Sequence, residues 1–150
     1  MPFNTFAEHI DMKIYVSRIP EEGLTEQATY NPASLDMDRI DIHPRQPFRV
    51  EARIQKADQE LIVQADIHAP LTMTCARCLE EFTSTVTPHN VFTYRVGSTE
   101  VVDITEDVRE EVMLAYPLVP ICRPACKGLC PACGQNLNQI LCAHPQHHAA

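Results

Sequence analysis

The sequence predicts an α+β domain: a mostly antiparallel β-sheet, one main helix packed on it, and a cysteine-rich C-terminal tail. Three observations predict this class. Apolar and polar residues alternate with a period of two through much of the chain, one segment has helical periodicity, and six of the seven cysteines gather in three close pairs. At 150 residues the chain is long enough to form one domain with a real core.

Alternating segments predict the strands of the sheet. These segments are residues 12–19, 48–55, 61–68, 82–86 and 90–96. Residues 57–60 form a plausible hairpin turn between the second and the third of them. Residues 24–46 are polar and rich in turn-forming residues, so we expect a loop there, with one short helix near 33–37.

Residues 103–116 predict the main helix. Asp103 is the expected N-cap, and Glu106 follows three residues later as in a capping box. Pro117 disfavours helix at Tyr116 and therefore ends the element. The segment also carries one apolar stripe for packing against the sheet, made of Ile104, Val108, Val112 and Ala115.

Eight residues have the types and spacing of zinc ligands. A closed structural zinc site takes four cysteine or histidine ligands, usually as two close pairs, so eight ligands predict about two zinc ions per chain. Close cysteine pairs in a protein expected in the cytoplasm indicate metal or redox chemistry rather than structural disulfides. The predicted ligands are Cys75, Cys78, Cys122, Cys126, Cys130, Cys133, Cys142 and His144.

The pairs can combine in two ways. In the preferred grouping, the pair at 75 and 78 joins the pair at 122 and 126, and the remaining four residues form a second site. The alternative is one sequential site from residues 122, 126, 130 and 133. His147 could compete with His144 for the last position. A redox role for the pair at 75 and 78 is a further alternative, although a strand follows it, whereas a helix follows a thioredoxin-type pair.

Composition excludes several classes of function. There is no apolar run long enough for a membrane span, no signal peptide, no glycine-rich phosphate loop and no catalytic motif, so we expect a cytoplasmic protein that is not an enzyme. The formal net charge of −8 argues against broad phosphate binding. Arg49, Arg53 and Arg77 are candidates for a local RNA-phosphate patch; the alternative is a solvated sheet face.

Three stretches of the chain resemble a known family. They are TCARCLEEF at 74–82, LAYPLVP at 114–120 and CKGLCPACGQNLN at 126–138. These stretches resemble the bacterial and plastid YceD family (domain of unknown function 177), over roughly residues 10–144. The usual family tail motif is CxC, whereas this chain has Cys142-Ala-His144.

The resemblance implies a non-enzymatic role in the accumulation of 23S ribosomal RNA and in assembly of the large ribosomal subunit. The implied partner is precursor 23S RNA or an early large-subunit ribosomal protein, with no membrane or nucleotide. We expect one YceD-like domain over 1–150, with a core at about 10–120 and a zinc-stapled tail at about 121–144. The alternatives are a redox-sensing zinc chaperone and a zinc-stabilised interaction module without an RNA role.

Overall fold

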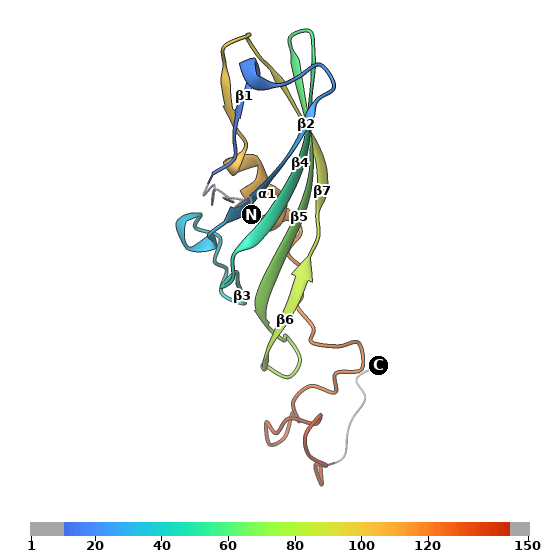
Figure 1. Ribbon diagram of the computed structural model, residues 1–150. Coiled ribbons are helices and arrows are strands. Elements are labelled where there is room, and N and C mark those ends of the chain that lie inside the picture. Colours follow the sequence, from blue (N-terminus) through green and yellow to red (C-terminus); the bar gives the residue numbers. More distant parts are fainter. Residues whose placement is uncertain (1–10, 145–150) are drawn as a thin grey trace, which may run out of the picture.

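The computed structural model describes residues 11–144 and contains a long twisted sheet, one α-helix and a C-terminal tail beyond one end of the sheet (Figure 1). The central strand is β5 (Glu60–Thr74), with 15 residues. β4 and β7 flank its first half, and β3 and β6 flank its second half, all antiparallel. The flanking strands are β3 (Ile42–His43), β4 (Phe48–Ala57), β6 (Glu81–Val86) and β7 (His89–Arg95).

Pro70 lies within β5 at a position where a strand can tolerate it. The backbone N–H of Thr74 donates to Asp41 on the β3 side, and that of Ile67 donates to Pro88 on the β6–β7 side. Even-numbered residues of β5 therefore direct their N–H groups toward β4 and β3. Pairing with β4 ends at His68 and pairing with β3 begins at Thr72. The missing N–H of proline thus falls in the gap between two partner strands, where it costs no ladder hydrogen bond.

The core lies between the inner face of the sheet and α1 (Thr105–Leu114). Alternation on β4 and β5 buries every second side chain, as in Val50, Ala52 and Ile54. From the helix, Val108 and Val112 are fully buried against this face. This arrangement confirms the predicted fold class.

The helix begins and ends close to the predicted positions. The carboxylate of Asp103 accepts a hydrogen bond from the backbone N–H of Thr105 at 2.9 Å, although the residue in the N-cap position is Ile104. Helical structure stops at Leu114, before Pro117. The buried stripe continues from the helix to Tyr116, which is 8% exposed.

The N-terminal region differs most from the sequence-based expectation. Part of the loop expected over 24–46 is a strand, β2 (Leu24–Tyr30), which pairs with β4 along its whole length. The prediction failed because β2 is an edge strand that buries only Ala28 and Tyr30, so its alternation is weak. The short helix expected near 33–37 is a 3₁₀ turn at Pro32–Ser34.

The first strand is also shorter than expected and lies outside the main sheet. β1 (Lys13–Tyr15) is followed by a 3₁₀ turn at Val16–Arg18. It pairs with β8 (Val101–Asp103), a strand that sequence alternation did not indicate. Among the described residues, 11–144, no helix is both long and apolar enough to cross a membrane.

Candidate metal centres

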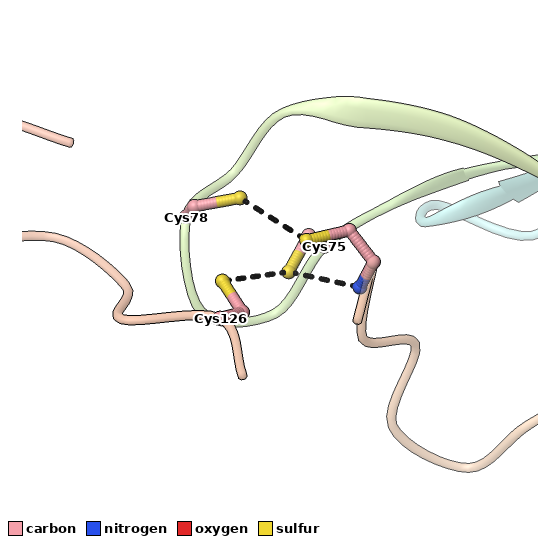
Figure 2. Close-up of side chains that lie close together, drawn as sticks. Cys75, Cys78 and Cys126 are labelled. Carbon is pink, nitrogen blue, oxygen red and sulfur yellow. Dashed lines mark hydrogen bonds between the residues drawn. The ribbon is translucent and has the colours of Figure 1, made fainter. Parts of the chain in front are cut away.

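The first candidate centre joins the end of the sheet to the tail. Cys75 and Cys78 lie in the turn between β5 and β6, which we call the knuckle; Cys122 and Cys126 follow the strap, residues 115–121, which leads from α1 to the tail. Figure 2 shows Cys126 of the tail directed toward Cys75 and Cys78 of the knuckle. The Cys75 and Cys126 sulfurs are 3.8 Å apart, and the Cys78 and Cys122 sulfurs 3.9 Å. Sulfurs around a tetrahedral zinc lie about 3.8 Å apart, so this spacing fits the metal.

Backbone geometry fixes the knuckle. The N–H of Leu79 donates to the carbonyl of Cys75, and the N–H of Cys75 donates to Glu80, each at 2.9 Å. Leu79 closes the turn with φ of +60°, an uncommon conformation for a side chain of this size. The strap docks on the same turn, because the N–H of Ala76 donates to the carbonyl of Pro120 at 2.8 Å. Two segments far apart in sequence are therefore held together at the first centre.

The four thiols of the first centre differ in pKa because their electrostatic environments differ. Burial opposes ionisation of Cys75, but hydrogen bonds from the backbone N–H groups of Cys78, Cys122 and Arg77 outweigh it and lower the pKa of the Cys75 thiol to about 6. For Cys122, burial and the neighbouring sulfurs raise the pKa of the thiol to about 12. Burial also opposes ionisation of Cys126, but hydrogen bonds from the Asn138 side chain and the backbone N–H of Gly128 help to lower the pKa of its thiol. Negative charge is thus stabilised on two of the sulfurs, while the crowded neighbouring sulfurs resist ionisation of Cys122. A divalent cation would relieve that crowding and favour all four thiolates.

The second candidate centre lies within the tail. Its ligand atoms come from Cys130, Cys133, Cys142 and His144, and they all lie within 4.8 Å of one another. The Cys142 sulfur is 3.4 Å from that of Cys130 and 3.5 Å from that of Cys133. Nδ1 of His144 lies 2.9 Å from the Cys142 sulfur. Three sulfurs and one imidazole nitrogen therefore converge on one point.

A glycine-closed turn presents the first pair of this second centre. The N–H of Gly134 donates to the carbonyl of Cys130 at 2.8 Å, and Gly134 has a φ of +73°. Nothing lies within 4 Å of the place where a side chain at Gly134 would begin, so the turn needs glycine for its backbone angle rather than for space. Hydrogen bonds from the backbone N–H groups of Cys133 and Ala132 lower the pKa of the Cys130 thiol to about 6.

Asn138, which is not among the predicted site residues, connects the two centres. Its side-chain amide donates to the Cys126 sulfur at 3.4 Å. Its carbonyl oxygen accepts hydrogen bonds from the backbone N–H of Lys127 at 2.9 Å and from the guanidinium of Arg123 at 3.0 Å. A residue between the ligands of the second centre thus orients a ligand of the first. Its place in the GQNLN stretch was the only available signal in the sequence.

The structure brings all eight predicted ligands into the two groups of the preferred grouping. Each group supplies four soft or borderline donors, and every cysteine of the chain is a free thiol. Both groups therefore fit a metal ion and could each hold one, with no coordination position left for another molecule. Cys126 and Cys130, which the sequential alternative places in one site, lie in different groups. His147 lies outside the described residues.

The three candidate RNA-binding arginines lie in two separate places. Arg49 and Arg53 are exposed on the outer face of β4, opposite His68 and Gln64 of β5. Arg77 lies in the knuckle, beyond Thr74 at the other end of β5. Gln64 and Thr74 are about 33 Å apart at the usual rise of a strand. The structure therefore groups the first two arginines but not the third.

Arg77 has a structural environment that the sequence did not indicate. Its guanidinium donates hydrogen bonds to the backbone carbonyls of Pro124 and Cys126, at 3.2 Å and 3.3 Å. These bonds hold the tail against the knuckle. Arg49 borders an open hollow of about 380 Å³ on the sheet face, together with Gln27, Glu51, Asp66 and His68.

The fold and its two groups of ligands define a class: a single-helix antiparallel β-sheet protein whose cysteine-rich tail, together with the knuckle, could hold two metal ions. A model of the family "Large ribosomal RNA subunit accumulation protein YceD" matches residues 93–149 of the chain. The matched segment includes α1, the strap and six of the eight candidate ligands. The resemblance to the YceD family is thereby confirmed.

Two kinds of relative are similar to this chain. An uncharacterized protein of Mycobacterium tuberculosis is 27% identical over 124 residues, which cover 72% of this chain and 60% of the relative. A chloroplastic YCED homolog 1 of Zea mays, named as a large ribosomal RNA subunit accumulation protein, is 46% identical over 37 residues, 25% of this chain and 13% of the relative. Its Arabidopsis thaliana counterpart is 44% identical over 41 residues, with 27% and 13% covered.

The chain spans about 60% of the length of the mycobacterial relatives that it matches. No solved structure matches it.

Proposed function

We propose that this protein is a non-enzymatic, zinc-binding cytoplasmic factor for the accumulation or processing of 23S ribosomal RNA and for assembly of the large ribosomal subunit. The observation that carries the proposal is the family match over 93–149, a segment that supplies two ligands of the first candidate metal centre and all four of the second. The names of the plant relatives, which refer to large-subunit ribosomal RNA accumulation, support it.

Zinc is the metal that the donor sets favour. Four thiolates, or three thiolates with one imidazole, in tetrahedral arrangement are typical of structural zinc. Zinc at the first centre supplies a cross-link between the sheet and the tail, and at the second it folds the tail on itself. The ligands would be the two groups described above, Cys75, Cys78, Cys122 and Cys126, and Cys130, Cys133, Cys142 and His144.

The same donor sets support a role without catalysis. A catalytic zinc keeps one coordination position for water or substrate, whereas each group here supplies four protein ligands. The cross-linked tail then acts as a rigid extension of the sheet. Its function in this proposal is to bind and position another molecule.

The partner in this proposal is precursor 23S RNA or an early large-subunit ribosomal protein. Direct RNA contact through Arg49 and Arg53 remains a part of the proposal, because both are exposed on one face of β4. Arg53 lies 4.0 Å from Glu51, so this face carries mixed charge and favours weak contact. Arg77 belongs with the tail, where it bonds to backbone carbonyls.

Complementation of a deletion strain tests the proposed role. We expect the strain to accumulate precursor 23S RNA and to lose large subunits, and the parent gene to restore both. Primer extension at the ends of 23S RNA and sucrose-gradient profiles provide the measurements. A deletion strain with normal 23S RNA and normal subunits would refute the role and leave an interaction module without an RNA function.

The alternative function, a redox-sensing chaperone, predicts a different result in an oxidation experiment. Closed zinc sites should keep their metal in stoichiometric peroxide, because bound thiolates with no open position oxidise slowly. Zinc release followed with a colorimetric indicator, together with aggregation of a heat-unfolded client protein, decides between the two. Rapid release coupled to suppression of aggregation would establish the chaperone and overturn our proposal.

A further inference from the structure

An apolar surface lies at the end of α1 and along the strap that follows it. Leu114 is 78% exposed, Leu118 92% and Val119 60%. Figure 1 shows the strap, in orange, leading from α1 toward the tail. Proteins that act alone seldom gather several large apolar side chains at one exposed place. Within the described part of the chain, nothing covers these three side chains.

A neighbouring turn is fixed to the strap by hydrogen bonds and carries a further exposed apolar side chain. Ile40, at the tip of that turn, is 95% exposed. The guanidinium of Arg39 donates to the carbonyl of Pro117 at 3.0 Å, and the hydroxyl of Tyr116 donates to the carbonyl of Met37 at 2.9 Å. These bonds hold the turn and the strap together, so the surface is preorganised. We call the four exposed side chains the strap surface: Ile40, Leu114, Leu118 and Val119.

One end of the strap surface continues into an acidic ridge. Glu106, Glu110 and Leu114 are spaced by four residues and therefore share one face of α1, and all three are exposed. Residues 103–120 contain five carboxylates and one arginine. This segment thus has a net charge of −4, half of the formal net charge of −8 of the whole chain, and it lies beside the strap surface.

We propose that the strap surface and the acidic ridge form a docking site for a basic polypeptide segment that carries apolar side chains. Its apolar residues would cover Leu118 and Val119, and its lysines or arginines would lie along Glu106 and Glu110. Charge complementarity identifies this occupant: the ridge repels the phosphates of RNA and of anionic lipids, and a neutral or acidic segment would not neutralise it. Within the chain, Glu106 has a loose ion pair with Arg109 at 3.8 Å, which leaves the segment with its net negative charge.

This docking site goes beyond the proposed function and does not depend on it. Binding at the strap can fail while the role in RNA accumulation stands, and the reverse also holds. RNA contact, where it occurs, would use the opposite type of surface, the arginines on β4. The two surfaces can therefore be tested with separate variants.

A defined peptide tests the docking site. The probe is a fluorescent 15-residue amphipathic peptide of lysine and leucine, measured by anisotropy with the full-length zinc-loaded protein. Leu118→Ser combined with Val119→Ser should weaken binding by at least about tenfold, because each leucine-sized side chain buried in an interface is worth about one order of magnitude or more. Glu106→Gln combined with Glu110→Gln should also weaken it and should reduce its salt dependence.

Matched variants elsewhere separate docking from general adhesion. Ile140→Ser with Leu141→Ser removes exposed apolar residues from the tail, and Glu21→Gln with Glu22→Gln removes the same charge far from α1. Neither pair should change peptide affinity. Amide chemical shifts on peptide addition should change along 105–120 and near Ile40. Equal weakening by the control pairs, shifts confined to another face, or a 20-nucleotide single-stranded RNA that competes for the strap would overturn the proposal.

Discussion

The side-chain amide of Asn138 donates a hydrogen bond to the sulfur of Cys126 at 3.4 Å. The same side chain accepts bonds from the tail backbone at Lys127 and from Arg123. A loop closed by the second centre therefore places a donor on a ligand of the first. Donors of this kind stabilise the charge of the thiolate and orient the ligand. At metal sites in general, their removal typically weakens metal affinity by roughly 10- to 100-fold.

Replacement of Asn138 by alanine should therefore weaken zinc binding at the first centre by about 10-fold or more, without unfolding the sheet. In competition with a chelator of known affinity, the variant should show one weakly bound and one tightly bound zinc ion, whereas the parent should show two tightly bound ions. Gln135→Ala, which removes an exposed side chain from the same tail, is the control. Release of both ions as in the parent protein would show that Asn138 has no such role.

Zinc content is the most direct measurement on the two centres. We expect about two zinc ions per chain, because each four-ligand group is complete. Elemental analysis of protein purified without chelators provides the count. A count near one would contradict the assignment of both groups as zinc sites, and the Cys133→Ser variant would then show whether the retained ion belongs to the second centre.

Loss of Cys78 should destabilise the protein more than loss of Cys133. Cys78 is 4% exposed in a centre that joins the tail to the sheet, whereas Cys133 is exposed in a centre within the tail. Cys78→Ser should lower the melting temperature by about 10 °C, since each kcal/mol is worth about 2–4 °C in a chain of this size. Cys133→Ser should lower it much less. Thermal unfolding followed by circular dichroism compares them, and two equal shifts would contradict this difference.

Zinc release should occur in acid and not near neutral pH. Backbone N–H groups lower the pKa of Cys75 and of Cys130 to about 6, so both remain thiolates at pH 7. A thiol whose pKa is lower in the folded chain adds stability above its unfolded value, and this contribution is lost as the pH falls through about 6. The measurement is the transfer of zinc to an indicator as the pH is lowered from 8 to 4. We expect this transfer to begin below about pH 6. Release already complete at pH 7 would contradict the prediction.

Reversing the charge of the two exposed arginines on β4 tests whether they contact RNA or only face solvent. Arg49→Glu with Arg53→Glu should weaken association with precursor ribosomal particles and leave folding and zinc content unchanged. Each lost phosphate contact should reduce the slope of log affinity against log salt by roughly 0.7–0.9. Lys13→Glu on β1, with Arg18→Glu in the 3₁₀ turn that follows it, is the matched reversal.

Arg77→Glu has to be examined separately, because that change also removes two bonds to tail carbonyls. Normal association and normal 23S RNA in the variant with both β4 reversals would show that this face is only solvated.

The sequence by itself determined the elements whose signals are local. Alternation from Phe48 onward, the cap and stripe of the helix near Asp103, and the cysteine spacings predicted the main strands, α1 and the eight candidate ligands, because each depends on residues close together in the chain. Even the hairpin turn at 57–60 followed from its neighbours, and the structure pairs Ala57 with Glu60.

Only the tertiary structure decided the features that depend on distant partners. β2 is a strand because this polar segment forms backbone hydrogen bonds with β4. β1 pairs with β8, which lies nearly ninety residues away in the sequence. The separation of Arg77 from Arg49 and Arg53, and the bond from Asn138 to Cys126, likewise arise from how segments pack. Such contacts leave little periodic trace in the sequence, because edge pairing and side-chain bonds to a distant atom require no local pattern.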